Sequence, residues 1–480
     1  MHQSKTVRLL SLLSRQELDK FLAYTKSPYF NTNQHLIHLL EYLIPLAPDF
    51  DKSVISYQNA FIAVFKRLPQ GEEEKSAIPK LASKLLRLAE GFIEQEQLAT
   101  MPFFSAYFRK RWFRKNSQSD WEEDVLRQMK VLNTQNGIHD KYRSLCTYFI
   151  EYEEAQTTVF KELILEKLDL SRLNASIDAY YLHEKLETLC HIANHSLIAN
   201  QKYEVPETEQ VLQLLALRME KLSPVTQLWQ KALALLQDPG ATAKYLDLKN
   251  SLENYGRLLS PPDHHVLFQY LLNTARFVFT DSAEYIREMM HLYKHQIQTG
   301  AILFNGYIIP DTFFNVIAVA IGLREREWAH HFFRQYKDKL DPRNHKSEGI
   351  RHFSESMLLF ELEQYEQALE RLNNTVFKDI QIKLAERRLR IKIYLELNYE
   401  ELLLDQLNTF RKFLSVNKSI IPQHHELGNK TFINAVSLLS KMEHRSDRHH
   451  AKLEELVASS PILPEKKWIS RKIEQLDQRN

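Results

Sequence analysis

Residues 108–115, "FRKRWFRK", combine five basic and three aromatic side chains in eight positions. Surfaces that bind single-stranded nucleic acid have this composition, because bases stack on aromatic rings while Arg and Lys neutralise phosphates. A helix that buries its aromatic face and solvates its charges has the same composition. The spacing of the residues therefore has to decide between the two.

The spacing favours the buried arrangement. On a helix, one apolar stripe with the periodicity of core residues contains Met101, Phe104, Phe108 and Trp112. The basic residues occupy the remaining faces, and the acidic stretch that follows, "DWEED" (120–124), lowers the local positive field. We therefore predict that Phe108 and Trp112 are buried and that the charges stay in water, Arg109 and Arg114 among them. The sequence argues against nucleic acid as a partner of this stripe.

A second basic stripe lies within residues 75–93. Lys80, Lys84 and Arg87 recur at i, i+4 and i+7, opposite an apolar face made of Leu81, Leu85, Leu88 and Phe92. A DNA-recognition helix has this pattern, and so does any exposed helix of a bundle. Residues 1–100 carry 12 basic and 11 acidic residues, which gives no net attraction to DNA. An alternative function stays open: a transcription regulator with a DNA-binding N-terminal helical unit and a solenoid sensor region.

The sequence contains none of the spaced motifs on which catalytic and cofactor sites depend. The 10 glycines are scattered, so no loop brings several backbone amides to one phosphate. His191 and His195 have the i, i+4 spacing of a zinc pair, but no third ligand follows at a matching spacing. We predict no catalytic residue, no metal site and no cofactor, and we expect that the chain is not an enzyme.

The composition predicts an all-α protein. Only 10 of 480 residues are Gly, and good helix formers dominate. The periodicity predicts about 22 helices that cover about three quarters of the chain. The formal net charge is +2, and no apolar run approaches the roughly 20 residues of a membrane span. The two cysteines have no metal-ligand spacing, and we expect a cytoplasmic protein outside the membrane.

One stretch departs from the helical pattern. Residues 300–310, "GAILFNGYIIP", contain an Asn305-Gly306 dipeptide between apolar runs. Asn-Gly favours a two-residue hairpin turn, because both residues tolerate positive φ. The flanking residues do not alternate, and an apolar loop between two helices fits them equally well.

Residues 311–415 contain a repeat. Tyr365 in "QYEQALERL" and Tyr399 in "NYEELLLDQL" lie 34 residues apart, and Trp328 precedes Tyr365 by 37 residues. Aligning the tyrosines pairs Met357 with Ile391 and Phe360 with Tyr394. With "LEQYEQALERL" (362–372) and "LDP" (340–342), this period resembles the tetratricopeptide repeat family. We predict that Trp328, Tyr365 and Tyr399 occupy equivalent junctions, each packed between its own helix pair and the next.

The resemblance implies an α-solenoid of stacked antiparallel helix pairs, because one pair cannot bury its apolar face alone. In that family the first helix of each pair lines the concave surface. Carried onto this chain, the family's positions give these partner-binding residues: Phe353, Met357, Phe360, Arg387, Ile391 and Tyr394. As a whole, the chain also resembles bacterial helical-repeat proteins that open on an "SPYFN"-like segment (27–31), a likeness that implies no activity.

The predicted organisation has four parts: an N-terminal helical bundle (1–100), irregular helix pairs (101–300), tetratricopeptide-like repeats (311–415) and a C-terminal helical cap (416–480). The last helix of the cap turns Trp468, Ile469, Ile473 and Leu476 inward. The leading interpretation is a non-enzymatic protein-interaction scaffold. An apolar and aromatic groove with an arginine suits a partner protein or peptide that carries an acidic group. In the alternative interpretation, which stays open, these residues pack against another helix of the same chain and leave no vacant groove.

Overall fold

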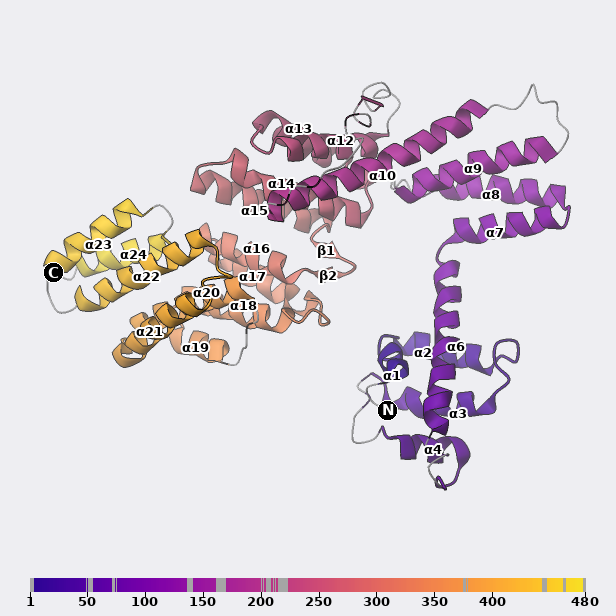
Figure 1. The fold of residues 1–480 in the computed structure, drawn as a ribbon, viewed down its shortest axis with the longest axis horizontal. Helices are drawn as coiled ribbons and strands as arrows, with labels where there is room; N and C mark the ends of the chain where they lie inside the picture. The colour runs from indigo at the N-terminus through magenta and orange to yellow at the C-terminus, as the bar shows by residue number, and fades with distance from the viewer. Residues whose placement is uncertain are drawn as a thin grey trace. The chain divides into compact units, whose positions relative to one another are not determined.

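The computed structural model is almost entirely helical (Figure 1). It describes residues 4–48, 50, 55–70, 74, 76–135, 141–160, 170–199, 201, 203, 209, 211, 213–214, 223–373, 377, 379–442, 447–460 and 463–477. Helix accounts for 81% of the structure, which confirms the prediction of an all-α protein. Within these ranges no helix is both long and apolar enough to cross a membrane.

The chain divides into two compact units. The first comprises Met1–Gly137 and Tyr142–Asp178, and the second comprises Ile138–Lys141 and Ala179–Asn480. The division falls within α10 (Leu170–Ala199), so the predicted middle region contributes to both units. The predicted boundaries near 300–311 and 415 both lie inside the second unit. Helices pack against one another across each of them, so neither separates two compact units.

The first unit contains two hydrophobic cores. One core draws on residues between Val7 and Phe92 and lies within the predicted N-terminal bundle, 1–100. The other draws on residues between Phe103 and Ile150. The helices of this unit are α1 (Lys5–Leu10), α2 (Arg15–Lys26), α3 (Gln34–Leu43), η1 (Ile44–Leu46), α4 (Tyr57–Phe65), α6 (Ala77–Ala99), α7 (Pro102–Lys115), α8 (Ser119–Gln135), α9 (Lys141–Phe160) and the start of α10.

In the second unit each helix packs against the next. From α12 to α24 every consecutive pair of α-helices is in contact, and so are α12 with α14, α16 with α18, α18 with α20, and α22 with α24. After the end of α10, the helices are α12 (Pro224–Gln237), α13 (Thr242–Tyr255), η4 (Gly256–Leu258), α14 (Pro261–Val278), α15 (Ser282–Thr299), α16 (Pro310–Gly322), α17 (Arg326–Tyr336), η5 (Lys337–Lys339), α18 (Ser347–Glu361), α19 (Tyr365–Asn373), α20 (Ile380–Glu396), α21 (Glu400–Val416), α22 (Gln423–Met442), α23 (Asp447–Ser459) and α24 (Lys466–Asp477).

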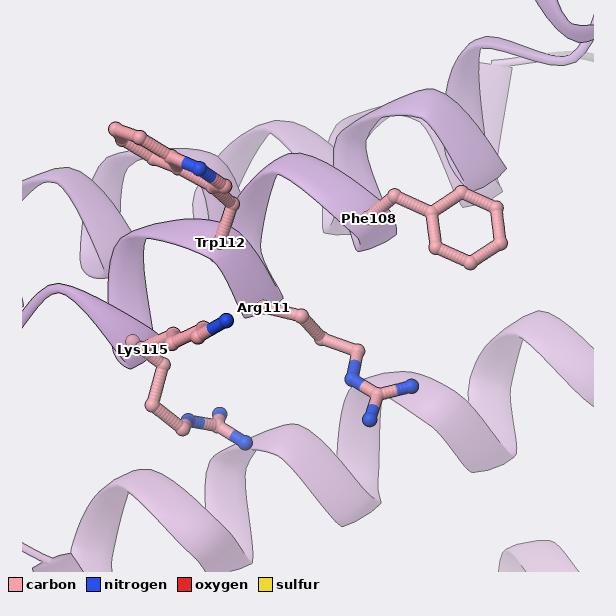
Figure 2. A pocket seen from close by; sticks show the side chains of 5 residues that line it. Phe108, Arg111, Trp112 and Lys115 are labelled. Carbon is pink, nitrogen blue, oxygen red and sulfur yellow. The ribbon is translucent and has the colours of Figure 1, made fainter.

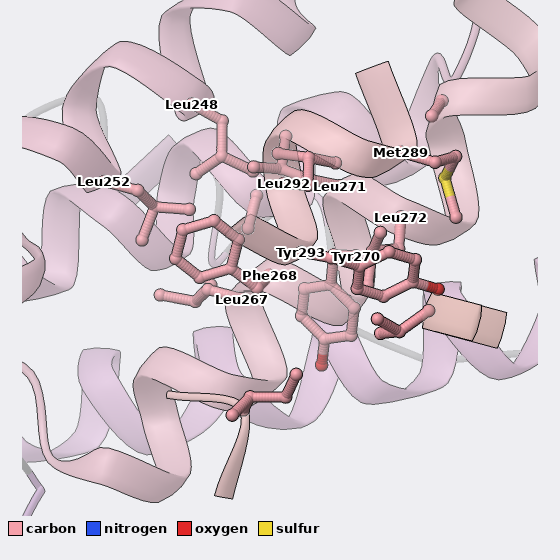
Figure 3. Packing of buried hydrophobic residues seen from close by; sticks show 14 of the residues in the cluster. Leu248, Leu252, Leu267, Phe268, Tyr270, Leu271, Leu272, Met289, Leu292 and Tyr293 are labelled. Atoms are coloured by element: carbon pink, nitrogen blue, oxygen red, sulfur yellow. The ribbon is translucent and has the colours of Figure 1, made fainter. Parts of the chain in front are cut away.

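Two hydrophobic clusters fill the second unit. One extends from Leu182 to Leu358, and the other from Phe353 to Ile473. Figure 3 shows part of the first cluster, where leucine and aromatic side chains of α13, α14 and α15 interdigitate. Two tyrosine hydroxyls in this cluster have polar partners: Tyr245 donates to Glu288 at 2.9 Å, and the Tyr270 hydroxyl lies 2.9 Å from His191 Nδ1. The His191 ring, considered above as half of a zinc pair, thus has a structural contact.

Three helix pairs of the second unit share the same turn. Arg324, Glu363 and Asn398 adopt left-handed backbone after α16, α18 and α20, with φ of 63°, 62° and 56°. In each turn the next amide donates to a carbonyl five residues back: Glu325 to Ala320, Gln364 to Leu359 and Tyr399 to Tyr394, at 2.9, 3.0 and 2.9 Å. This hydrogen bond is that of the Schellman motif, which ends the first helix of each pair.

These turns correct the predicted repeat register by one residue. The left-handed residues Glu363 and Asn398 lie 35 residues apart, not 34, and Arg324 precedes Glu363 by 39. Trp328, Tyr365 and Tyr399 follow their turns by four, two and one positions, so the prediction that they are equivalent is wrong. Trp328 and Tyr365 are half-buried, whereas Tyr399 is exposed. The tyrosine spacing predicted the wrong register because the turn is defined by its left-handed backbone residue. That residue is Arg, Glu or Asn in the three turns, so no common side chain marks it in the sequence.

Residues 300–310 contain a hairpin rather than an apolar loop. β1 (Leu303–Phe304) pairs antiparallel with β2 (Tyr307–Ile308). Asn305 and Gly306 between them have φ of 52° and 82°, the positive values that a two-residue hairpin turn requires. The dipeptide therefore outweighs the lack of alternation in its flanks.

Candidate functional site

A groove of about 550 Å³ lies in the second unit. Its lining comes mainly from the first helices of the three pairs, α16, α18 and α20, and from the start of α24. The turn register makes the lining regular. Phe314, Phe353 and Arg388 occupy equivalent positions, and so do Ala318, Met357 and Lys392. The groove is thus apolar along α16 and α18 and becomes basic along α20.

Three of the six predicted partner-binding residues line this groove. Phe353, Met357 and Phe360 do so, and their half-buried or buried side chains form part of its apolar surface. Arg387, Ile391 and Tyr394 do not, which corrects the prediction for α20. A period of 34 residues selects Arg387 and Ile391, whereas the observed spacing of 35 selects their neighbours Arg388 and Lys392. One residue turns a side chain by about 100° around a helix, which is enough to move it to another face.

The three misassigned residues pack elsewhere on α20. The Arg387 guanidinium lies 4.3 Å from the centre of the Phe413 ring on α21, and burial lowers its pKa from the ordinary value. Ile391 is completely buried, and Tyr394 lies beside Tyr399 with ring centres 6.4 Å apart. These residues therefore hold α20 against its neighbours inside the chain, as the alternative interpretation allowed.

The basic side of the groove holds an internal carboxylate. Glu465 lies 2.8 Å from Lys392 Nζ and 3.5 Å from Arg388 Nε. Burial acts to raise the pKa of Glu465, but the two neighbouring cations outweigh it and lower the pKa to about 2. Arg388 also donates to Asn429 at 2.9 Å, so its orientation is fixed from two sides. The groove thus already holds one carboxylate on Arg388 and Lys392.

The start of helix α24 forms part of the groove lining. The indole N–H of Trp468 on α24 donates to Glu396 on α20 at 2.9 Å. Nearby, Lys392 Nζ lies 4.5 Å from the centre of the Phe360 ring. Trp468, Ile469 and Ile473 are buried, as predicted for the cap. The groove is therefore partly filled by the chain, and the remaining volume is bordered by exposed Lys466, Lys467 and Arg471. The inward face of this helix was predictable from the sequence, but its position against α20 was not.

The basic stripe of α6 lies where the sequence predicted. Lys80, Lys84 and Arg87 are exposed on one side of the helix. Leu81 and Leu85 on the opposite side are buried in the core of the N-terminal bundle. This arrangement fits a solvated bundle helix and a DNA-binding helix equally well.

Helix α7 buries the face that the sequence assigned to water. Lys110 is fully buried, and its Nζ lies 3.1 Å from Glu122 Oε2 and 2.9 Å from Glu153 Oε2. Arg114 is half-buried and pairs with the same two carboxylates. Two cations and two carboxylates from α7, α8 and α9 therefore neutralise one another inside the unit. Periodicity alone misassigned the face, because paired charges can be buried where isolated charges cannot.

Two of the three aromatic residues of the predicted stripe are exposed instead, whereas Phe104 packs against the core of the unit. Phe108 is 54% and Trp112 60% exposed, so the prediction that both are buried is wrong. They border a surface hollow of about 520 Å³ together with Arg111, Arg114 and Lys115. In Figure 2, Phe108 and Trp112 extend away from α7, with the cationic groups of Arg111 and Lys115 beside them. Arg109 is exposed, as predicted, and donates to Gln128 at 2.6 Å.

Among the described residues, no three His, Cys, Asp or Glu side chains gather as a metal site would require. The structure offers two candidate surfaces: the apolar and basic groove lined by α16, α18, α20 and α24, and the exposed aromatic and basic face of α7. No family model, curated protein or solved structure matches the chain.

Proposed function

We propose that the chain is a non-enzymatic protein-interaction scaffold whose groove binds a peptide segment with apolar and acidic side chains. The observation that carries this proposal is the two-sided lining of the groove. Phe314, Phe353 and Met357 supply an apolar surface, and basic residues outnumber acidic ones around it: Arg324, Arg388, Lys392, Lys466, Lys467 and Arg471 against Glu361 and Glu465. A peptide gains affinity from the apolar contacts and orientation from its carboxylates.

We further propose that the second unit is an α-solenoid of helix pairs. Two observations support it. Each helix contacts the next along the chain, and alternate helices in the series α16, α18 and α20 contact one another. The same turn also follows all three of these helices. Stacked pairs place equivalent residues of their first helices side by side, which is the arrangement a continuous groove requires.

The ion pairs of Glu465 support the proposal that the partner is acidic. Its carboxylate occupies Arg388 and Lys392 in the isolated chain, and charge-assisted hydrogen bonds of this kind are stronger than neutral ones. The exposed cations Lys466, Lys467 and Arg471 lie around the rest of the groove. The carboxylates of a partner would contact these exposed cations and would not need to displace Glu465.

A random peptide display library, selected on the immobilised full chain, tests the proposal. We expect the enriched peptides to combine aromatic or aliphatic residues with Asp or Glu. A Lys467→Glu/Arg471→Glu variant should bind them about tenfold more weakly, the effect of about 1.4 kcal/mol of lost attraction. Lys412→Glu/Lys441→Glu makes the same charge change at exposed positions outside the groove and should bind as the wild type does.

Two results would contradict the proposal. One is enrichment of peptides without acidic residues. The other is equal binding by the groove variant and its control, which would place the peptide elsewhere. Circular dichroism melts of both variants ensure that weaker binding does not reflect unfolding, since surface substitutions of this kind change stability by only about 0.5 kcal/mol.

A further inference from the structure

We propose that the outward face of α7 binds single-stranded nucleic acid, with Phe108 and Trp112 stacking on bases and Arg111 and Lys115 contacting phosphates. This site lies in the first unit and takes a different class of partner from the groove. It goes beyond the proposed scaffold function and does not depend on it. The sequence argued against such a partner on the ground that the two rings are buried, and the structure removes that ground.

The charges of α7 divide between two faces. Lys110 and Arg114 point toward α8 and α9, where Glu122 and Glu153 neutralise them. Glu122 belongs to the acidic stretch 120–124 that was expected to cancel the positive field of this helix. Its carboxylate pairs with Lys110 and Arg114 on the buried side of α7. The stretch therefore lowers the positive potential of the outward face less than its composition indicates.

A second acidic residue of that stretch is also engaged locally. Asp124 pairs with Arg127 one turn along α8. On the outward face of α7, Arg111 and Lys115 are exposed beside the two rings. The face therefore presents positive charge next to aromatic surface, which complements the phosphates and bases of a nucleic acid strand.

The rings have the spacing that a single strand needs. Phe108 and Trp112 are four residues apart, about 6 Å along the helix axis. Successive stacked bases of one strand lie roughly 3.4 Å apart, so two bases separated by one nucleotide lie roughly 7 Å apart, close to the spacing of the rings. Arg111 and Lys115 each follow one ring by three residues, on the same side of the helix. Bases and phosphates alternate along a strand in the same way.

A duplex and a lipid surface fit this face less well. The bases of a duplex are stacked on each other, so their faces cannot stack on exposed side chains. A helix that lies in a membrane interface presents a long apolar face, whereas this face is bordered by exposed Arg109, Asn116 and Gln118. The two rings with adjacent cations favour an unpaired strand.

Fluorescence anisotropy of the full chain with labelled oligothymidylate and oligouridylate of about 12 nucleotides tests the proposal. We expect saturable binding that weakens as salt rises from about 50 to 200 mM, because phosphate contacts release counterions. Trp112→Ala should weaken binding about fivefold or more, the lower end of base–aromatic stacking. Lys115→Glu should weaken it and reduce its salt dependence.

Matched controls separate this site from general charge effects. Tyr255→Ala removes an exposed aromatic ring in the second unit, and Lys412→Glu reverses an exposed charge there. Both should bind the oligonucleotides as the wild type does. Phe108→Ala should repeat the effect of Trp112→Ala, and all variants should keep the wild-type melting temperature because the changed side chains are exposed.

Several outcomes would overturn the proposal. They are an absence of oligonucleotide binding, undiminished binding by a Phe108→Ala/Trp112→Ala double variant, equal affinity for a duplex, and binding to phosphatidylserine vesicles but not to oligonucleotides. A loss of binding in Lys80→Glu/Lys84→Glu/Arg87→Glu with full binding by the α7 variants would also overturn it. That result would assign nucleic-acid binding to α6.

Discussion

Lys110→Met removes one of the two cations from the buried charge cluster of the first unit. Lys110 is completely shielded from water, and the side chains of Glu122 and Glu153 are 11% and 1% exposed. The substitution keeps the length and apolar stem of the side chain but leaves two buried carboxylates with Arg114 alone. Breaking a buried pair costs about 3–5 kcal/mol. Because Arg114 still contacts both carboxylates, we expect the lower end, about 3 kcal/mol.

A loss of about 3 kcal/mol should lower the melting temperature of the first unit by about 6–12 °C, as expected for a unit of this size. Differential scanning calorimetry of the full chain measures the shift. Hydrogen exchange should locate it in α7, α8 and α9 and leave the helices of the second unit unchanged. Lys115→Met is the matched control on the same helix, because Lys115 is exposed, and it should change stability by no more than about 0.5 kcal/mol.

A double variant tests the physical reason for the loss. Lys110→Met/Glu153→Leu removes one cation and one carboxylate, which leaves Arg114 paired with Glu122. Apolar replacements of buried ion pairs are often neutral or stabilising, so the double variant should recover most of the stability that Lys110→Met loses. A single variant that costs less than 1 kcal/mol, or a double variant whose loss equals the sum of the two single losses, would refute the reasoning.

Three further predictions concern the second unit. The pKa of Glu465 in the folded chain is about 2, below its ordinary 4.5. Its ion pairs therefore stabilise α24 above pH 4.5, and this stabilisation should be lost as the pH falls toward 2. Hydrogen exchange of α24 measures the loss. Arg387→Glu should lower the free energy of unfolding by about 1–2 kcal/mol in denaturant melts, because the guanidinium lies 4.3 Å from the Phe413 ring. Gly256→Ala should cost about 1–3 kcal/mol in the same melts, because the added Cβ would lie 2.8 Å from His264 Nε2.

Each of these predictions has a matched control. Glu465→Gln should abolish the loss of α24 protection at low pH, since an amide does not titrate there. Arg411→Glu reverses an exposed charge on α21 and should leave stability unchanged. Gly240→Ala adds a Cβ that meets nothing closer than 3.9 Å. If Gly240→Ala costs as much as Gly256→Ala, helix and turn conformation rather than the contact with His264 explains the loss.

The local features that a few neighbouring residues determine were predictable from the sequence. The scarcity of glycine and the helical periodicity gave the all-α class. The alternation of Lys and Leu along α6 gave its exposed and buried faces. Asn305 and Gly306 favoured a hairpin, and a two-residue turn with positive φ is what the chain adopts there. These features depend on contacts or backbone preferences within about one or two turns of chain.

The candidate groove was only half predictable. Phe353, Met357 and Phe360 followed from one apolar helix face, but the lining of α20 depended on the repeat spacing. The side chains Tyr365 and Tyr399 suggested 34 residues, whereas the left-handed backbone at Glu363 and Asn398 sets 35. Backbone conformation at a non-glycine residue leaves little trace in the sequence, and one residue is enough to exchange Arg387 for Arg388.

The sequence by itself determined that α7 is a helix with an aromatic stripe among basic residues; only the tertiary structure decided which face is buried. Periodicity measures how apolar a face is, and by that measure Phe108 and Trp112 belong inside. Lys110 is inside instead, because Glu122 and Glu153 on two other helices supply the charges that make its burial possible. Such compensation joins residues up to 43 positions apart, and only the packing of three helices brings them together.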